Sequence, residues 1–304
     1  MVVLAGSAGA SGRPGVHAGV ERPYVFAFQR GADVAGDPAL PDTLWEATAD
    51  GRAVRKVVLP FDTVSSPRWS PDGKKLAIAT EDLTHSGDLV VMLAGGSGRV
   101  TLNGHGDCWS EIAWLPDGHS IACVAGPGKD NGLRVRLVAT HGGQTRLFRL
   151  SGEPHADNSS AELNSIDWSP RGGRFAVDDD ADGVYVVAAN GAVLSTISRN
   201  GNYPRWSPDG THILNLEKTL KGDTIVITST TGTRKRVLLH VPIFDAVASA
   251  AWSPDGTKIA YIGTDGLHIV DVTTGHDQLL NRLSSLCGPS TPAFCADLDW
   301  RRSA

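Results

Sequence analysis

The sequence predicts an all-β fold assembled from repeated hairpins, and three observations support this prediction. The heptapeptide PRWSPDG occurs at residues 67–73 and again at 204–210. Tryptophans recur at nearly regular spacing, and a second kind of hairpin recurs between them. No segment shows the apolar periodicity of a helix, so short strands and turns account for the whole pattern.

The first kind of hairpin, called the inner hairpin below, is clearest at residues 65–80. Ser70 to Gly73 fit a type I turn, because serine suits its first position, proline its second and glycine its fourth. After the turn, Leu76 and Ile78 alternate with alanines, as in a half-buried strand. The same unit recurs at 112–125, 166–179, 204–217 and 250–263.

Six tryptophans set the period of the repeat. Their average spacing is about 46 residues, which is the length of one four-stranded propeller blade. We expect their side chains to be apolar wedges between blades, because large aromatic rings bury the most area; ligand platforms are the alternative. The six are Trp69, Trp114, Trp168, Trp206, Trp252 and Trp300.

The second kind of hairpin, the outer hairpin, occurs six times, whereas only five inner hairpins are complete. The strand that ends at Trp300 is expected to pair with residues 24–28 and to complete the remaining blade. This pairing would leave no open sheet edge between the first blade and the last. The sequence therefore predicts one domain, residues 24–304, that is a six-bladed β-propeller with four antiparallel strands per blade. The outer hairpins span 43–59, 88–102, 133–150, 183–198, 223–239 and 266–280.

The W-S-P-D-G turn, its following strand and the outer hairpin resemble the PD40 (TolB-like) repeat, over roughly residues 24 to 301. The resemblance implies a propeller. It also implies a non-catalytic module that engages a protein or peptide partner in the cell envelope or outside the cell. A structural or regulatory domain of a larger assembly is an alternative, because propellers host many unrelated activities.

Catalytic motifs are missing from the sequence. It contains no G-x-S-x-G elbow, H-E-x-x-H motif, paired C-x-x-C or phosphate-binding glycine loop. Some related propellers are polysaccharide lyases that hold a metal through histidines, and in this chain the channel-side loops offer only His105. We therefore expect no enzymatic activity and no cofactor, with a lyase-like or other hydrolytic enzyme as the alternative.

The composition limits the partners. Net charge is −5 with the charges interspersed, which argues against nucleic acid. The chain has no apolar run of about 18 residues, so no membrane span is predicted. We expect a monomer.

Residues 1–23 are rich in small side chains and begin with a short apolar run. Ala8 and Ala10 resemble a signal-peptidase site, but the basic start and the long apolar core of a signal peptide are missing. A flexible leader and the remnant of a signal peptide both fit this segment.

The four cysteines form two local pairs along the chain. Cys287 and Cys295 lie on either side of a loop, and Cys108 and Cys123 lie on the two arms of one inner hairpin. Register across that turn places Cys123 opposite about residue 111, so Cys108 is near it but not directly opposite. Disulfides would indicate an oxidising compartment outside the cytoplasm. Buried free cysteines and a cytoplasmic location are the alternative.

An acidic run at 178–183 matches the first half of a calcium loop through Asp178, Asp180 and Asp182. The position that would need glutamate is Ala189. An acidic turn between two hairpins is the competing interpretation, so no metal site is predicted.

The direction of the chain indicates a binding face. The inner turns join the first two strands of each blade, so the longer connections from one blade to the next lie on the opposite face. Variable loops on a rigid scaffold often carry binding residues. We predict that peptide or glycan binding occurs at this loop-rich face, although a solvated polar loop also fits the pair His105 and Asp107. The candidate residues are His105, Asp107, Trp109, Glu162, Asn202, Tyr203, Phe244 and Asp245.

Overall fold

A computed structural model gives the fold. It describes residues 24–32, 42–61, 63–81, 86–102, 108–125, 134–141, 146–151, 163–179, 183–242, 247–280, 283, 286–287 and 293–301. The predicted leader, residues 1–23, lies outside this part of the chain.

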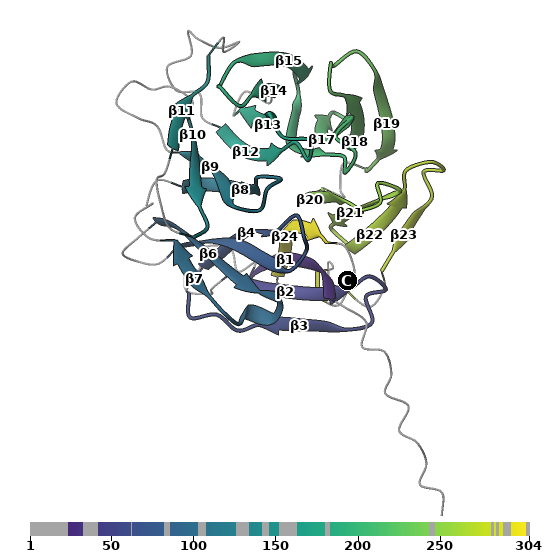
Figure 1. The fold of residues 1–304 in the computed structure, drawn as a ribbon. Coiled ribbons are helices and arrows are strands. Elements are labelled where there is room, and N and C mark those ends of the chain that lie inside the picture. Colours follow the sequence, from purple (N-terminus) through teal and green to yellow (C-terminus); the bar gives the residue numbers. More distant parts are fainter. Residues whose placement is uncertain are drawn as a thin grey trace, which may run out of the picture.

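Six four-stranded antiparallel sheets are arranged in a ring (Figure 1), and the blades of such a ring surround a central channel. The predicted six-bladed propeller is therefore confirmed. Blades are numbered 1 to 6 along the chain, and the strands of each blade are named from the channel outward. Blade 1 contains β24 (Ala293–Trp300), β1 (Tyr24–Ala32), β2 (Thr43–Thr48) and β3 (Val54–Val57). Blade 2 contains β4 (Thr63–Trp69), β5 (Lys75–Glu81), β6 (Ser86–Leu93) and β7 (Val100–Leu102).

The other four blades follow the same order. Blade 3 contains β8 (Cys108–Trp114), β9 (Ser120–Ala125), β10 (Arg134–Ala139) and β11 (Arg146–Arg149). Blade 4 contains β12 (Leu163–Trp168), β13 (Arg174–Asp179), β14 (Val184–Ala188) and β15 (Val193–Ser198). Blade 5 contains β16 (Gly201–Trp206), β17 (His212–Thr219), β18 (Gly222–Ser229) and β19 (Lys235–His240). Blade 6 contains β20 (Ser249–Trp252), β21 (Lys258–Gly263), β22 (Gly266–Asp271) and β23 (Asp277–Leu279).

The repeated turn is held by its own side chains. In blade 2 the backbone N–H of Gly73 donates to the carbonyl oxygen of Ser70 at 2.7 Å. Asp72 accepts the hydroxyl of Ser70 at 2.6 Å and the backbone N–H of Lys74 at 3.1 Å. Gly73 has φ +69°, a conformation that glycine adopts without steric cost. These local bonds explain why serine, aspartate and glycine recur together.

The first and last strands close the ring, as predicted. β24 pairs with β1 in antiparallel register, with Phe26 opposite Trp300 and Ala32 opposite Ala293. β24 is also the innermost strand of blade 1, so it lines the channel.

The tryptophans lie in the seams between neighbouring blades. Trp69, from blade 2, packs in one cluster with Ala27 and Leu44 of blade 1. Trp252, from blade 6, packs with Leu214 and other blade 5 residues. Five of the six are no more than 9% exposed, and Trp300 is partly buried against Phe26 with ring centroids 4.7 Å apart. Their packing is that of wedges between blades.

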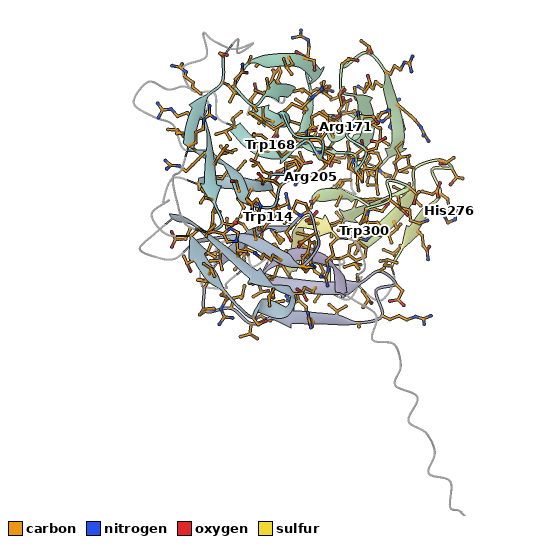
Figure 2. The ribbon with its side chains drawn as sticks, in the orientation of Figure 1. Trp114, Trp168, Arg171, Arg205, His276 and Trp300 are labelled. Atoms are coloured by element: carbon orange, nitrogen blue, oxygen red, sulfur yellow. A yellow bond between two sulfur atoms is a disulfide. The ribbon has the colours of Figure 1, made fainter. Side chains whose placement is uncertain are left out.

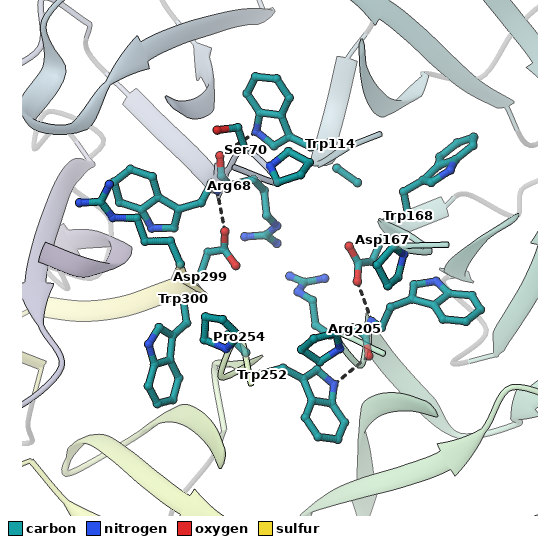
Figure 3. A pocket seen from close by; sticks show the side chains of 18 of the residues that line it. Arg68, Ser70, Trp114, Asp167, Trp168, Arg205, Trp252, Pro254, Asp299 and Trp300 are labelled. Atoms are coloured by element: carbon teal, nitrogen blue, oxygen red, sulfur yellow. Dashed lines mark hydrogen bonds between the residues drawn. The ribbon is translucent and has the colours of Figure 1, made fainter. Parts of the chain in front are cut away.

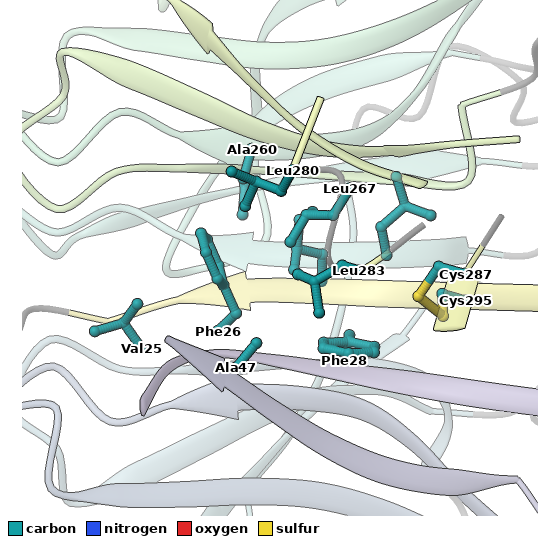
Figure 4. Packing of buried hydrophobic residues seen from close by; sticks show 13 residues of the cluster. Val25, Phe26, Phe28, Ala47, Ala260, Leu267, Leu280, Leu283, Cys287 and Cys295 are labelled. Atoms are coloured by element: carbon teal, nitrogen blue, oxygen red, sulfur yellow. A yellow bond between two sulfur atoms is a disulfide. The ribbon is translucent and has the colours of Figure 1, made fainter. Parts of the chain in front are cut away.

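Both local cysteine pairs form disulfides. Cys108 and Cys123 have Cα atoms 5.6 Å apart, and Cys287 and Cys295 have theirs 5.3 Å apart. The residue opposite Cys123 is Ile112, and a bulge between Cys108 and Ile112 brings Cys108 within reach of Cys123. Cys287 and Cys295 belong to the buried cluster that also contains Phe28 and Leu283 (Figure 4). Within the described residues, no helix is long and apolar enough to cross a membrane.

Candidate binding site at the channel mouth

A pocket of about 350 Å³ opens at the centre of the ring, at the mouth surrounded by the inner turns. All six tryptophans of the repeat line it, together with the turn prolines of five blades. Trp114, Trp168, Arg205 and Trp300 lie around the centre of the molecule, whereas His276 lies at its outer edge (Figure 2). Every blade therefore contributes to this pocket, which we call the turn-side pocket.

The residue immediately before each tryptophan reaches the channel, and its identity follows a repeating order. Aspartate, arginine and alanine occupy blades 1 to 3, and the same three residue types occupy blades 4 to 6. The ring therefore has an approximate two-fold symmetry that relates blade 1 to blade 4, blade 2 to blade 5 and blade 3 to blade 6. The six residues, from blade 1 to blade 6, are Asp299, Arg68, Ala113, Asp167, Arg205 and Ala251.

The two copies of PRWSPDG stand on opposite blades in this arrangement, and their arginines meet at one carboxylate. Arg68 Nη2 lies 3.0 Å from Glu111 Oε1, and Arg205 Nη1 lies 2.9 Å from Glu111 Oε2. Arg205 Nη2 also donates to Glu111 Oε1 at 2.9 Å. Each guanidinium further donates to the carbonyl of the proline before it. All three side chains are at least nine-tenths buried. Glu111 has no acidic counterpart in blade 6, where Ser249 occupies its position, so it breaks the two-fold symmetry.

Neighbouring charges, rather than solvent, favour the ionised forms of Glu111 and Arg205. Burial opposes ionisation of Glu111, but Arg205 and Arg68 outweigh it and hold the pKa of Glu111 below its usual value. Burial likewise disfavours the charged form of Arg205, and Glu111 outweighs it and raises the pKa of Arg205. A paired buried charge of this kind is costly to disrupt.

Asp299 and Asp167 join neighbouring blades in the same way. Asp299 Oδ2 accepts the backbone N–H of Trp69, and Asp167 Oδ2 accepts that of Trp206, each at 2.6 Å. In Figure 3 the guanidinium groups of Arg68 and Arg205 lie near the centre of the pocket, flanked by Asp299 and Asp167. Burial raises the pKa of Asp167 to about 6 despite the nearby Arg205, and burial also raises the pKa of Asp299.

Two further carboxylates make equivalent bonds to the innermost strands of the next blades. Asp297 accepts the backbone N–H of Ser66 at 3.0 Å, and Asp178 accepts that of Tyr203 at 3.3 Å. Ser66 and Tyr203 have φ +51° and +52°, at strand bulges three residues before the tryptophans. Asp178 also accepts the hydroxyl of Ser165. Burial raises its pKa to about 6.

These contacts bear on the calcium interpretation. Asp178 is fully buried and serves as an acceptor for Tyr203 and Ser165. Asp180 and Asp182 lie outside the described residues. Across the described ranges, no group of three histidine, cysteine or acidic side chains is arranged to hold a metal ion.

The rim of the pocket repeats the two-fold pattern. The indole N–H of Trp114 donates to the carbonyl of Arg68 at 2.9 Å, and that of Trp252 donates to the carbonyl of Arg205 at 3.2 Å. Arg301 lies over the ring of Trp69, 4.2 Å from its centroid, and donates to the carbonyl of Gly73 at 2.6 Å. One guanidinium of the chain itself is therefore held on the aromatic rim.

Most of the predicted binding residues lie outside the described part of the chain. His105, Asp107, Glu162, Phe244 and Asp245 are among them, and of Trp109 only the backbone, in β8, is described. Asn202 and Tyr203 lie in β16, and Tyr203 is 37% exposed. Binding at the loop-rich face stays a prediction.

Sequence reasoning missed the charged residues of the turn-side pocket and the glutamate that pairs with two of them. Arg68, Glu111, Asp167, Arg205 and Asp299 are buried or partly buried charges on inner strands, and none was predicted to belong to a site. A signal was present, because a charged residue directly precedes four of the six repeat tryptophans. A charged side chain is unusual on an inner strand that only packs against its neighbours, so a charge at this position indicates a functional or strained site.

Comparisons with known proteins agree with this geometry. A family model described as the TolB beta propeller domain (PD40) matches residues 43–270. Among solved structures, TolB from Acinetobacter baumannii has a TM-score of 0.67 and 17% identity, over 91% of this chain and 66% of that one. The chain thus spans slightly less than two thirds of that protein.

Two further solved structures are similar. A putative TolB from Agrobacterium tumefaciens has a TM-score of 0.61 and 17% identity, over 92% of this chain and 99% of that one. The Cps50 (Swd1) propeller domain of Myceliophteria thermophila has a TM-score of 0.57 and 13% identity, over 90% of this chain and 95% of that one. At such identities the likeness concerns the fold alone. No curated protein sequence matches the chain.

Proposed function

Because the chain belongs to the family of TolB β-propeller domains, we propose that it is a non-catalytic module that binds a protein or peptide partner at a mouth of its central channel. The turn-side pocket is the observation that supports this proposal most directly. Its volume of about 350 Å³ is in the range of small-ligand sites, and it suits one or two side chains of an inserted segment.

The construction of the pocket suits the recognition of a partner. Its walls come from all six blades, and carboxylates from blades 1 and 4 fix the positions of the neighbouring tryptophans. A rigid site of this kind loses little conformational entropy when a partner binds. Around it, the turns provide a broad surface that a folded partner can cover.

The proposed place of action is outside the cytoplasm. Both disulfides join residues close in sequence, 15 and 8 positions apart. Such bonds persist in oxidising compartments and are rare where glutathione keeps thiols reduced. The signal-peptide interpretation of residues 1–23 is compatible with this location and is part of the proposal.

Site-specific photo-crosslinking tests the proposal. A photoreactive amino acid is placed at Pro116 or Pro254 on the turn-side rim, at Tyr203 toward the other mouth, and at Val58 on the outer edge. Val58 is 79% exposed and serves as the control. A specific partner should be captured from the turn-side positions and not from Val58.

The captured partner is then purified and its affinity measured. If it binds in the pocket, Pro116→Arg should weaken binding at least about tenfold, or about 1.4 kcal/mol, and Val58→Arg should leave it unchanged. A partner that responds to Tyr203→Ala instead would assign binding to the loop-rich face. Equal capture from all positions, or none, would contradict the proposal.

A further inference from the structure

We propose that the turn-side pocket binds a carboxylate of a protein partner, from an acidic side chain or from a chain end, and that Arg68 and Arg205 hold it. This inference rests on the proposed function and specifies the chemistry of the group that enters the pocket. It follows from the charged groups that line the pocket, from the donors that lack partners there and from the bonds that its two aspartates already make.

Cationic groups occupy the centre of the pocket. Among the described residues that line it, the charged side chains are those of Arg68, Arg205 and Arg301 against Asp167 and Asp299. The guanidinium groups of Arg68 and Arg205 lie near the centre, between the two aspartates (Figure 3). A group that reaches the centre therefore lies beside two guanidinium groups, whose planar fork of donors matches the geometry of a carboxylate.

Buried donors without partners belong to the same lining residues. In the described part of the chain, the Nε atoms of Arg68 and Arg205 and the indole nitrogens of Trp69 and Trp206 are buried and have no hydrogen-bond acceptor. Arg68 Nη2 also makes no hydrogen bond, although it forms an ion pair with Glu111 at 3.0 Å. None of the buried unpartnered atoms of the lining residues is an acceptor. A buried donor without a partner is costly, so an occupant with acceptor oxygens can offset this deficit, whereas a further donor would add to it.

Glu111 alone pairs with both arginines. Its Oε1 and Oε2 atoms make the ion pairs with Arg68 and Arg205, and Glu111 is not among the residues that line the pocket. Each guanidinium presents several N–H donors, so one carboxylate does not use the capacity of two such groups. Two positive charges also exceed its single negative charge. A second carboxylate, supplied by a partner from the pocket side, would balance the two guanidinium groups and form charge-assisted hydrogen bonds with them.

The two aspartates of the wall oppose a carboxylate, and their bonds limit this opposition. Oδ2 of Asp167 accepts the backbone N–H of Trp206, and Oδ2 of Asp299 accepts that of Trp69, each at 2.6 Å. Burial raises the pKa of both aspartates, so each takes up a proton more readily than an exposed aspartate and can then donate a hydrogen bond. We therefore expect the charge of these two aspartates to weaken the binding of a carboxylate, and its removal to strengthen binding.

The test uses three pentapeptides, capped at both ends, that differ only in the central residue: glutamate, glutamine or lysine in a background of alanine. Glutamine has the shape of glutamate without its charge. Two alanine pentapeptides, one with a free terminal carboxylate and one amidated, test a chain end as the source. Binding is followed by NMR through the indole N–H signals of the eight tryptophans, which also report whether each variant is folded. A carboxylate peptide should bind at least about tenfold more tightly than its neutral counterpart, and the lysine peptide most weakly.

Two variants with opposite expected effects locate the carboxylate. In Arg68→Gln the preference for the carboxylate peptide should fall to about twofold or less, because one of the two guanidinium groups is lost. In the double variant Asp167→Asn and Asp299→Asn, the carboxylate peptide should bind at least about threefold more tightly, because asparagine keeps an acceptor oxygen and removes the opposing charge. A merely structural role of these residues predicts no gain in binding.

Each variant has a matched control outside the pocket. Arg146→Gln removes an exposed arginine on β11, and Asp117→Asn removes an exposed aspartate on an inner turn. Both controls should leave the preference of the parent protein unchanged. If Arg68→Gln does not fold, the double aspartate variant decides the question, because it depends on a gain of binding.

The outcomes separate this inference from the proposed function. Three results would each overturn the inference: no advantage of either carboxylate peptide over its neutral counterpart, a full preference in folded Arg68→Gln, or no gain in the double aspartate variant. A crosslinked partner that enters the pocket through a neutral or basic side chain would also overturn it, while the proposed function would stand. Absence of any partner at either mouth would contradict the proposed function itself.

Discussion

Arg205 and Glu111 are 94 residues apart in the sequence, and their side chains meet at 2.9 Å inside the channel. Arg68 reaches the same carboxylate from the opposite side of the ring. Blades 2, 3 and 5 are thus connected through one buried side chain. Glu111 thus forms ion pairs with buried arginines of two other blades. The first of five predictions concerns its replacement.

Glu111→Gln should destabilise the protein by about 3–5 kcal/mol, because two buried guanidinium groups would lose the carboxylate that forms an ion pair with both. Urea unfolding followed by tryptophan fluorescence measures this change. Asp50→Asn is the control, because it removes a partly exposed pair with Arg52 and should cost no more than about 1 kcal/mol. A loss of similar size in both variants would contradict the prediction.

Stability should increase as the pH falls from about 7.5 to about 5. Burial raises the pKa of Asp167 and Asp178 from 3.8 to about 6, so the folded state binds protons more readily than the unfolded state in this window. The destabilisation due to these ionised groups is present above pH 6 and is relieved as the pH falls toward 4. Urea unfolding at several pH values measures the trend. Asp178→Asn should flatten it, and a stability that falls steadily from pH 7.5 to 5 in the parent protein would contradict this account.

His268 should titrate above 6.5. Burial disfavours its charged form, but hydrogen bonds to Asp277 at 3.1 Å and to Asp265 at 2.7 Å outweigh burial and raise the pKa of His268. Its stabilising contribution is complete below pH 6.5 and is lost as the pH rises through the higher folded value. An NMR titration of the imidazole measures this pKa directly. In Asp265→Asn the pKa should decrease, and a parent value below 6.5 would refute the interpretation.

Gly232→Ala should destabilise the protein by several kcal/mol. Gly232 has φ +74°, and a methyl group there would collide with the carbonyl oxygen of Thr196 in the neighbouring blade. Gly172 has a similar φ of +71° with nothing within 4 Å, so Gly172→Ala should cost only the backbone strain of about 1–2 kcal/mol. Thermal unfolding of both variants gives the comparison. Equal losses would mean that the contact with Thr196 relaxes without cost.

Replacing Cys108 and Cys123 together by alanine should reduce stability by about 3 kcal/mol, because the bond closes a loop with a sequence separation of 15. Replacing Cys287 and Cys295 should cost less, since their separation is 8. Intact mass after alkylation tests the bonds themselves. The folded protein should react at none of its four cysteines before reduction and at all four afterwards. Reaction of the folded protein without reductant would contradict both pairings.

The fold was predictable because its signals are local. Ser70, Asp72 and Gly73 make their bonds within one turn, so the turn can be recognised wherever its residues recur. The closing strand followed from the count of hairpins. The disulfide partner of Cys123 was harder to place, because a bulge in β8 shifts the register by an amount that residue spacing does not show.

The candidate site could not be predicted because its contacts are distant. Asp299 and Trp69 are 230 residues apart and meet only when the ring is closed. The order aspartate, arginine, alanine before the tryptophans is visible in the sequence. Its meaning depends on the ring geometry, which places equivalent residues of blades 1 and 4 on opposite sides of one pocket.

The closing strand also determines when the pocket can form. β24 follows every other described strand along the chain, so the ribosome produces it after all of them. It carries Asp297 and Asp299 into the channel and is followed by Arg301 on the rim. Blades 2 to 6 have all their strands before β24 is made, whereas blade 1 waits for it. A nascent chain thus has no complete turn-side pocket until β24 has been made.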